Sequence, residues 1–262
     1  AQIVAPGGRT VFNQAVMLRS FLRLENFSVP GPQARSRAFV NPYAVVWGFR
    51  PDWNLTVVVP FVTLDTEQSI RGERTEDTRS GFADAQIFLK YDGLYKKNVR
   101  RGFTRLAGEF GVRVPSGRSG FTSNTVDYLF ALIFSHVRDR HWLVADSQYL
   151  LTRENSGGTN PGNHWNYDFA YLYRLLPWRG FEGKNLFLVG ELNGEFFTRN
   201  RMQGVSVANS GGNILFFSPG VQFLPTRQIV LEFAAPVPIY RDLNGLQPKP
   251  TSTFIMGIRY LF

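Results

Sequence analysis

Apolar and polar residues alternate with a period of two along most of the chain, which is the pattern of β-strands that present two different faces. Residues 164–176 show it most clearly, because one face is entirely aromatic: Trp165, Tyr167, Phe169, Tyr171 and Tyr173. The opposite face carries polar and charged residues, among them Asn166, Asp168 and Arg174. The same division recurs in the other strand-like segments, which predicts a sheet with one apolar and one polar surface.

Twelve such segments are predicted, most of them 10 to 15 residues long: 11–25, 39–50, 53–64, 81–91, 103–114, 125–137, 141–153, 164–176, 184–199, 214–224, 228–237 and 254–262. Strands of soluble proteins are usually about 5 to 6 residues long, whereas a tilted strand that crosses a bilayer needs about 9 to 11. The connections alternate between short turns and longer loops, as the periplasmic turns and extracellular loops of outer-membrane barrels do.

The pattern therefore predicts an all-β fold, a single transmembrane antiparallel up-and-down β-barrel of about 12 strands with both termini periplasmic. We expect one domain over residues 1–262, with 1–10 as a periplasmic lead-in, and the last strand should pair with the first to close the sheet. A soluble β-sandwich or lipocalin-like fold is the alternative. It is disfavoured because it would have to bury an aromatic face in strand after strand.

Aromatic residues near the predicted strand ends suggest two girdles at the lipid interfaces. One girdle is predicted on the turn side, from Trp47, Trp53, Tyr91, Trp142 and Phe262. The other is predicted on the loop side, from Phe61, Phe82, Trp165 and Phe254. This arrangement favours a location in the bacterial outer membrane.

The composition narrows the possible functions. The chain has 262 residues, no Cys and three His, so disulfides and thiolate metal sites are excluded. No run approaches the roughly 18 apolar residues of a membrane helix. The chain starts at Ala1, as expected after removal of a signal peptide. The net charge is +9, but the arginines are scattered over loops and strands, so nucleic acid is not an expected partner.

The three histidines do not suggest an enzyme. His136 is predicted on the lipid-facing side, His141 beside a turn, and His164 at the opposite rim. None lies on the predicted lumen face beside a Ser two positions away, where a barrel hydrolase would need its base. His and carboxylates are not clustered either, so we expect no catalytic residues, no metal and no cofactor.

The predicted inner face carries many charges, which a water-filled lumen tolerates. The candidate lumen or constriction residues are Arg19, Asp84, Glu109, Arg113, Asp127, Asp146, Asp168, Glu191, Glu195, Glu232 and Arg259. Salt bridges that stiffen the wall are one interpretation. The other is a mid-height acidic constriction, formed by Glu109, Asp146, Glu191 and Glu232, that slows anions and admits neutral or cationic solutes.

Several partners are predicted from the same pattern, beginning with outer-membrane lipid around the barrel. Basic residues of the outer loops can pair with lipopolysaccharide phosphates: Arg35, Arg37, Arg71, Arg74 and Arg79. The turn at 96–101 is basic and suits an acidic periplasmic or envelope partner. The terminal Tyr260 and Phe262 resemble the signal that the barrel assembly machinery recognises.

A set of short motifs occurs in order along most of the chain. They are Trp47-Gly48-Phe49-Arg50-Pro51-Asp52-Trp53-Asn54-Leu55, Val59-Pro60-Phe61, Gly81-Phe82-Ala83-Asp84, Leu89-Lys90-Tyr91, Val114-Pro115-Ser116-Gly117, Glu191-Leu192-Asn193-Gly194, Ser218-Pro219-Gly220-Val221-Gln222 and Ala235-Pro236-Val237-Pro238. Together they resemble the outer-membrane family named for the meta-cleavage pathway of phenol degradation. One departure is Ala83, where that family commonly has Gly. The resemblance implies a barrel transporter or channel for small, often aromatic or hydrophobic, compounds, and it implies no catalytic residue.

Two functions are therefore expected from the sequence. The first is an outer-membrane channel that passes small solutes, aromatic or hydrophobic compounds among them, through a charged lumen. The alternative is a structural or partner-binding barrel whose lumen is blocked by its own side chains and which serves as a sheath or anchor for another envelope component.

Overall fold

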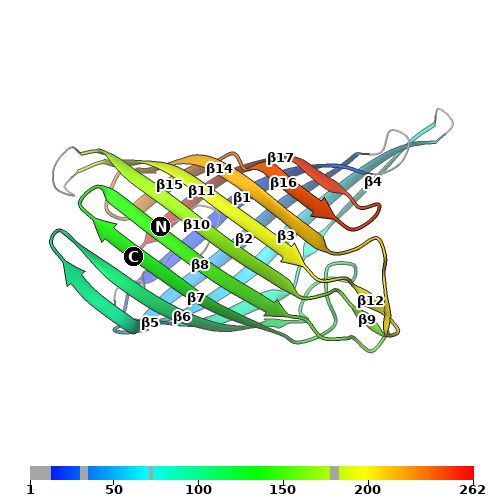
Figure 1. Ribbon diagram of the computed structural model, residues 1–262, viewed down its shortest axis with the longest axis horizontal. Helices are drawn as coiled ribbons and strands as arrows, with labels where there is room; N and C mark the ends of the chain where they lie inside the picture. Colours follow the sequence, from blue (N-terminus) through cyan, green and yellow to red (C-terminus); the bar gives the residue numbers. More distant parts are fainter. Residues whose placement is uncertain (1–12, 30–34, 71–72, 178–182) are drawn as a thin grey trace.

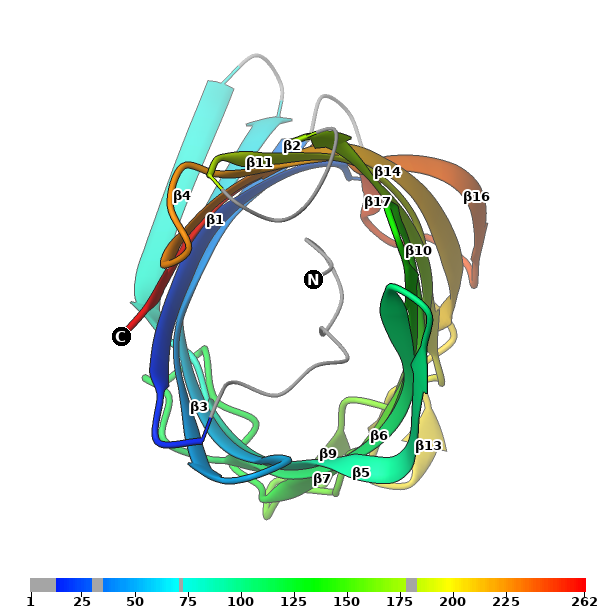
Figure 2. The same cartoon turned by 90° about the vertical axis from the view of Figure 1, so that its left-hand side faces the viewer.

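The computed structural model describes residues 13–29, 35–70, 73–177 and 183–262. These residues form a large antiparallel sheet of strongly tilted strands that curves round and closes on itself (Figures 1 and 2). No helix among them is long and apolar enough to cross a membrane. The expected lead-in at 1–10 and the start of the first predicted strand lie outside the described residues.

The strand bounds are as follows: β1 Val16–Ser28, β2 Arg35–Arg50, β3 Trp53–Ile70, β4 Glu73–Phe82, β5 Ala85–Val99, β6 Gly102–Val114, β7 Asp127–Arg138, β8 His141–Leu151, β9 Thr159–Asn160, β10 His164–Leu176, β11 Asn185–Phe197, β12 Arg201–Met202, β13 Val205–Ser206, β14 Gly212–Leu224, β15 Ile229–Ala234, β16 Val237–Leu243 and β17 Lys249–Leu261. Strands β9, β12 and β13 form a small separate sheet within the outer loops. All the others belong to the barrel.

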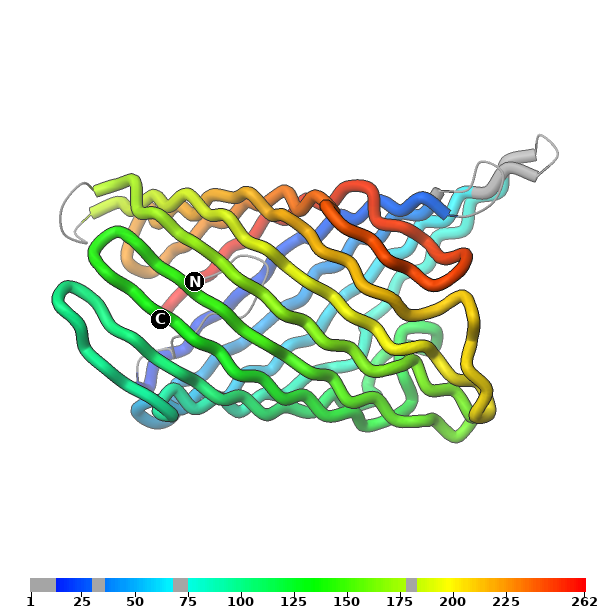
Figure 3. Tube along the Cα trace, in the orientation of Figure 1, coloured from blue at the N-terminus to red at the C-terminus, as the bar shows by residue number. Residues whose placement is uncertain are grey.

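The barrel is closed by pairing of β17 with β1, from Met17 opposite Leu261 to Ser28 opposite Lys249. Its sheet contains 14 strands, but β4 and β5 share one place beside β3, and β15 and β16 share one place beside β14. Fourteen strands minus these two duplications leave 12 positions around the wall. Two-residue turns join β2 to β3, β5 to β6 and β7 to β8 at the end where β1 begins and β17 ends (Figure 3). The predicted twelve-stranded antiparallel barrel is confirmed.

Three predicted connections are in fact strand. Residues 65–70 and 73–79 continue β3 and β4 as paired strands beyond the rim, residues 92–99 extend β5, and most of 238–252 belongs to β16 and β17. The hairpin is polar on both faces; Glu67, for example, is paired directly with Glu76. Outside the membrane both faces of a ribbon meet water, so the period of two disappears from the sequence although the strand continues.

Side chains divide between the two faces of the wall as the alternation predicts. On β7 the outward Leu132 is 55% exposed, whereas its neighbour Ile133 is fully buried on the inner side. An apolar outer surface of this extent requires lipid, and a closed barrel is the β-structure that can span a bilayer, because it leaves no unpaired edge in lipid. The barrel is therefore a transmembrane one of the bacterial outer-membrane type.

Aromatic pairs mark both ends of the lipid-facing surface. Trp53 stacks on Tyr91 at 4.6 Å near the turns, and Phe61 meets Phe82 edge-on at 5.2 Å near the loops. The prediction for Trp142 was wrong, because its ring faces the lumen and packs against Phe187 at 5.2 Å. His141, the first residue of β8, points outward, so the next residue, Trp142, points to the inner face.

Gly194 on β11 lies directly opposite Tyr167 on β10. The ring of Tyr167 lies over this glycine so closely that an added Cβ would be 2.1 Å from the ring, and the Tyr167 hydroxyl donates a hydrogen bond to Asn213 Oδ1 at 3.0 Å. We expect Gly194→Ala to lift the ring, break this hydrogen bond and cost about 1–3 kcal/mol in urea unfolding. Gly190→Ala is the matched control, because its Cβ would meet only Phe217 at 3.8 Å. Equal effects of the two substitutions would contradict the packing explanation.

Candidate functional site: the charged lumen

Acidic side chains gather on the inner face of three neighbouring strands. They are Asp146 on β8, Asp168 on β10, and Glu191 and Glu195 on β11. Asp146 and Asp168 are directly paired in register. We call these four residues the acidic wall.

Hydrogen bonds to neutral side chains hold part of the acidic wall in place. Asn193 Nδ2 donates to Asp168 Oδ1 at 2.8 Å, and its Oδ1 accepts a hydrogen bond from Ser218 Oγ at 2.6 Å. Asn193 and Ser218 are both buried. A buried polar network of this kind orients its members, because each lost partner would leave a buried polar group without compensation.

Arginines gather on the opposite side of the lumen. Arg19 and Arg23 come from β1, and Arg259 comes from β17 directly opposite Arg19 in the register. Of the twelve positions around the ring, β8 is six places from β1, which is halfway round. These three residues are here called the arginine wall. It lies across the barrel from Asp146 on β8, whereas β11, which carries Glu191 and Glu195, is three places from β17 and four from β1.

Glu232 on β15 is the acid that holds the arginine wall together. Its carboxylate accepts a hydrogen bond from Arg259 Nε at 2.8 Å and a second, shorter one from Arg259 Nη2. Gln222 Nε2 donates to the same carboxylate at 2.9 Å, and Arg19 Nε lies 3.7 Å from it. Glu232 and Arg259 are both buried, so this is a charge pair largely removed from bulk water.

One ion pair joins the two walls directly. Arg23 Nη2 lies 3.6 Å from Glu195 Oε1 and also pairs with Glu25 of its own strand at 2.6 Å. Strands β1 and β11 are not neighbours, because β14, β15 and β17 stand between them in the wall. The Arg23–Glu195 pair is therefore a bridge across the lumen rather than along its surface.

The remaining mid-height acid, Glu109, is paired directly with Lys90 across β5 and β6. Lys90 is buried, and Asp92 and Asp146 also contribute to the electrostatic field at its ammonium group. The mid-height acidic constriction stays a prediction. Bases accompany these acids in the lumen, because Lys90 is opposite Glu109 and Arg259 pairs with Glu232.

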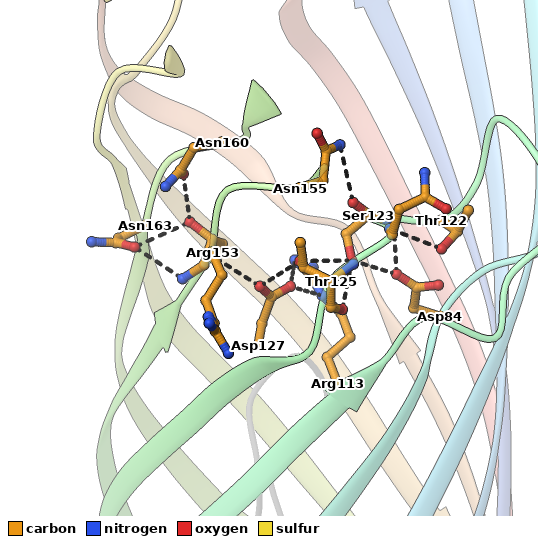
Figure 4. Close-up of polar contacts among 12 residues, drawn as sticks. Asp84, Arg113, Thr122, Ser123, Thr125, Asp127, Arg153, Asn155, Asn160 and Asn163 are labelled. Atoms are coloured by element: carbon orange, nitrogen blue, oxygen red, sulfur yellow. Dashed lines mark hydrogen bonds and ion pairs between the residues drawn. The ribbon is translucent and has the colours of Figure 1, made fainter. Parts of the chain in front are cut away.

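Asp84, Arg113 and Asp127 lie at the outer rim, where they anchor loops (Figure 4). Asp84 accepts hydrogen bonds from Gly117 N at 3.0 Å and from Ser123 N at 2.7 Å. Asp127 accepts from Arg113 Nε at 2.9 Å, from Thr125 Oγ1 at 2.9 Å and from Arg153 N at 2.9 Å. Their hydrogen bonds are made to the loops over 115–126 and 152–163, so these residues shape the entrance rather than the middle of the lumen.

An apolar cluster occupies the inner face mainly in the half of the barrel nearer the turns. It consists of Ala107, Ile133, Val144, Ala170, Leu172, Phe187, Val189, Ala234 and Ile255, with Phe21, Trp142 and Leu224 packed against it. Its members come from strands on opposite sides of the ring, such as β7 and β17, so side chains fill part of the lumen. Sequence reasoning missed this layer because it followed only the charged inner positions. The layer could have been predicted from short runs of consecutive apolar residues, such as 129–134 and 186–189, in which both faces of the strand are apolar.

The histidines are placed separately. His136 Nδ1 lies 2.9 Å from Thr104 Oγ1, His141 Nδ1 lies 2.6 Å from the Tyr171 hydroxyl, and the His164 ring meets Phe197 edge-on at 4.8 Å. Within the described ranges, no group of three or more His, Asp or Glu side chains is arranged to hold a metal ion.

The predicted partner sites lie at the two ends of the barrel. On the turn side, Lys96 pairs with Asp52 and Arg101 Nη1 lies 3.3 Å from Asp139. In the outer hairpin Arg79 pairs with Asp77 at 2.8 Å. Arg71 and the side chains of Arg35 and Arg74 lie outside the described part of the chain, and binding of lipopolysaccharide or of a periplasmic partner stays a prediction. The rings of Tyr260 and Phe262 pack edge-on at 4.6 Å on the outer face of β17.

Comparison with solved structures gives matches to outer-membrane barrels over nearly the whole chain. An outer membrane channel from Pseudomonas putida F1 superposes with a TM-score of 0.73 at 13% identity, covering 99% of this chain and 100% of that one. The β-domain of the Bordetella autotransporter BrkA gives a TM-score of 0.55 at 10% identity, covering 95% and 99%. The NanC porin gives 0.50 at 12% identity, covering 94% and 98%. At these identities the likeness is one of fold.

Sequence comparison gives the family. No curated protein sequence matches the chain. The sequence model of one family matches residues 22–237, which run from the middle of β1 through the end of β15. The resemblance noted in the short sequence motifs is thereby confirmed. The chain belongs to the family described as "Putative MetA-pathway of phenol degradation".

Proposed function

We propose that the protein is an outer-membrane channel that passes small solutes through its lumen. The observation that carries this proposal is the pair of charged walls, acidic on β8, β10 and β11 and basic on β1 and β17. Charged side chains in the middle of a membrane-spanning structure are costly unless they meet water or each other, and they mark solute pathways.

Walls of opposite charge create an electric field across the lumen. A solute that carries both a positive and a negative end, or a strong dipole, lowers its energy by turning to match that field. The Arg23–Glu195 bridge lies in this path and narrows it. Passage then favours small solutes whose own polar groups can replace Arg23 or Glu195 as partner in the ion pair while the solute goes by.

The apolar cluster suggests the class of solute. Phe21, Trp142 and Phe187 offer aromatic surface next to the charged walls. A small molecule with an aromatic ring and a polar group suits this lumen. Its ring can pack against the apolar cluster, and its polar group can meet the charged walls. The family description, which refers to phenol degradation, agrees with this class.

Single-channel recording of the purified protein in planar bilayers tests the proposal. We expect discrete ion currents. If no current appears under any voltage or salt condition, the channel function is refuted.

Substitutions at the bridge give a sharper prediction. Glu195→Gln should lower the preference for cations and Arg23→Gln should raise it, because each change removes one sign of charge from the lumen. The double variant should conduct more than the native protein, since the bridge across the lumen no longer forms. Asp77→Asn in the outer hairpin is the control and should leave the reversal potential unchanged. Unchanged reversal potentials in both lumen variants would contradict a role of the bridge in selectivity.

A sealed barrel that anchors another envelope component is the second candidate function. The apolar cluster favours it, because the cluster joins strands on opposite sides of the ring and so fills part of the lumen. On this proposal the protein carries no current, and neither does the variant with Arg23 and Glu195 both replaced. Currents through the native protein would exclude it.

A further inference from the structure

The small sheet of β9, β12 and β13 has two chemically different faces. Its central strand places Arg201 between Asn160 and Ser206, so these three side chains lie in a row on one face. The other face carries Thr159, Met202 and Val205 by the same register. Side chains that are opposite one another in a ladder point the same way, so the sheet presents one polar, cationic surface.

That polar face forms one side of a pocket of about 370 Å³. The volume falls within the roughly 300–1,000 Å³ typical of small-molecule sites. The lining residues are Leu151, Thr152, Asn160, Gly162, Asn163, Thr198, Arg199, Arg201 and Ser206. The row of Asn160, Arg201 and Ser206 is included, whereas the opposite face of the sheet is not.

The two asparagine amides present hydrogen-bond donors to this pocket. Asn163 Oδ1 accepts from Thr152 N at 2.9 Å and from Thr152 Oγ1 at 3.1 Å. Asn160 Oδ1 accepts from Gly162 N at 2.9 Å and lies 3.0 Å from Thr152 Oγ1, whose single proton is shared between the two asparagine oxygens. With both oxygens engaged, each amide keeps its NH₂ group for another partner. Figure 4 shows the nitrogen of Asn163 on the side away from its hydrogen bonds.

All the charged side chains that line the pocket are positive. Arg199 and Arg201 both line it, and no Asp or Glu does. Both arginines are exposed, and neither has an ion pair among the described residues. Two guanidinium groups, two amide donors and a hydroxyl form a set that complements a group rich in acceptor oxygens.

We propose that this pocket binds a phosphate-bearing ligand. Arg199 and Arg201 neutralise its charge, and the amides of Asn160 and Asn163 donate to its remaining oxygens. The pocket opens beside the lipid-facing surface, because its lining residue Leu151 is 40% exposed on the outer end of β8, directly opposite the outward Tyr128 of β7. The phosphate therefore comes either from the headgroup of an outer-leaflet lipid or from a soluble phosphorylated solute near the channel entrance.

The test is a titration of the purified, full-length barrel in non-ionic detergent. The probes are bisphosphorylated lipid A, the same lipid A without its phosphates, and inorganic phosphate. We expect the native protein to bind bisphosphorylated lipid A more tightly than the dephosphorylated form if the source is lipid, or to bind inorganic phosphate by itself if the source is soluble. The variant with Arg199→Gln and Arg201→Gln should bind the preferred probe about tenfold more weakly or worse.

Arg241→Gln is the matched control, because Arg241 is an exposed arginine on β16 that does not line the pocket. It should bind the probes as the native protein does. Heat-dependent migration on gels checks that all variants are folded barrels, which is expected because the exchanged side chains are exposed. The proposal is overturned if neither phosphate probe binds, if lipid A binds equally with and without its phosphates while inorganic phosphate does not bind, or if the double variant keeps the native affinity for the preferred probe. Channel currents are measured separately, so failure here leaves the proposed function standing.

Discussion

Glu232→Gln should lower the free energy of unfolding of the barrel by about 3 kcal/mol or more. The reason is that Glu232 is the acceptor for Arg259 and Gln222 and lies 3.7 Å from Arg19, so its loss leaves buried positive charge without its counter-charge. Removing one partner of a buried pair costs far more than the pair itself contributes, because the other charge stays in a place where water cannot fully solvate it. Urea unfolding of the protein refolded in lipid vesicles, followed by tryptophan fluorescence, measures the change.

Asp77→Asn is the control for this experiment. Asp77 and Arg79 form an ion pair in the outer hairpin with both side chains more than half exposed. Exposed pairs contribute at most about 1 kcal/mol, so little change is expected. A similarly small effect of Glu232→Gln would show that lumen water solvates Arg259 and that the pair does not hold the wall together.

Phe262→Ala should sharply reduce the amount of folded protein that reaches the outer membrane. Phe262 ends the closing strand, its amide donates to Val16 O at 2.8 Å, and its ring packs on Tyr260 on the lipid face. If the two rings are the signal that the assembly machinery reads, the loss acts before the barrel is formed. The measurement is the yield of the heat-modifiable barrel in purified outer membranes, compared with the yield after unassisted refolding into vesicles.

Phe254→Ala provides the matched control, because Phe254 lies on the same outer face near the middle of β17. It removes the same apolar area but lies eight residues before the end of the chain. We expect near-native yield in cells. Equal losses for the two variants, in cells and in vesicles alike, would show that lost contact with lipid rather than recognition explains the effect.

Much of the fold follows from alternation alone. The parity of residues 254–262 put Arg259 inside and Phe262 outside, and the structure has both as predicted. Alternation also puts Trp142 on the inner face, where the structure has it, so the wrong prediction came from its place near a strand end. Alternation does not reveal the outer parts of β3 and β4 beyond the rim. Both faces of these segments meet water, so neither face has to be apolar.

Alternation and strand length are local properties that the bilayer selects, so the amino-acid pattern is enough to predict a closed barrel and to place Arg259 on its inner face. The pattern could not determine which charges meet. Arg23 and Glu195 are 172 positions apart and lie on strands that are not neighbours, and Glu232 draws its partners from three different strands. Those contacts depend on the register of every pairing around the ring and on where the ring closes, and both are properties of the folded barrel rather than of any local pattern.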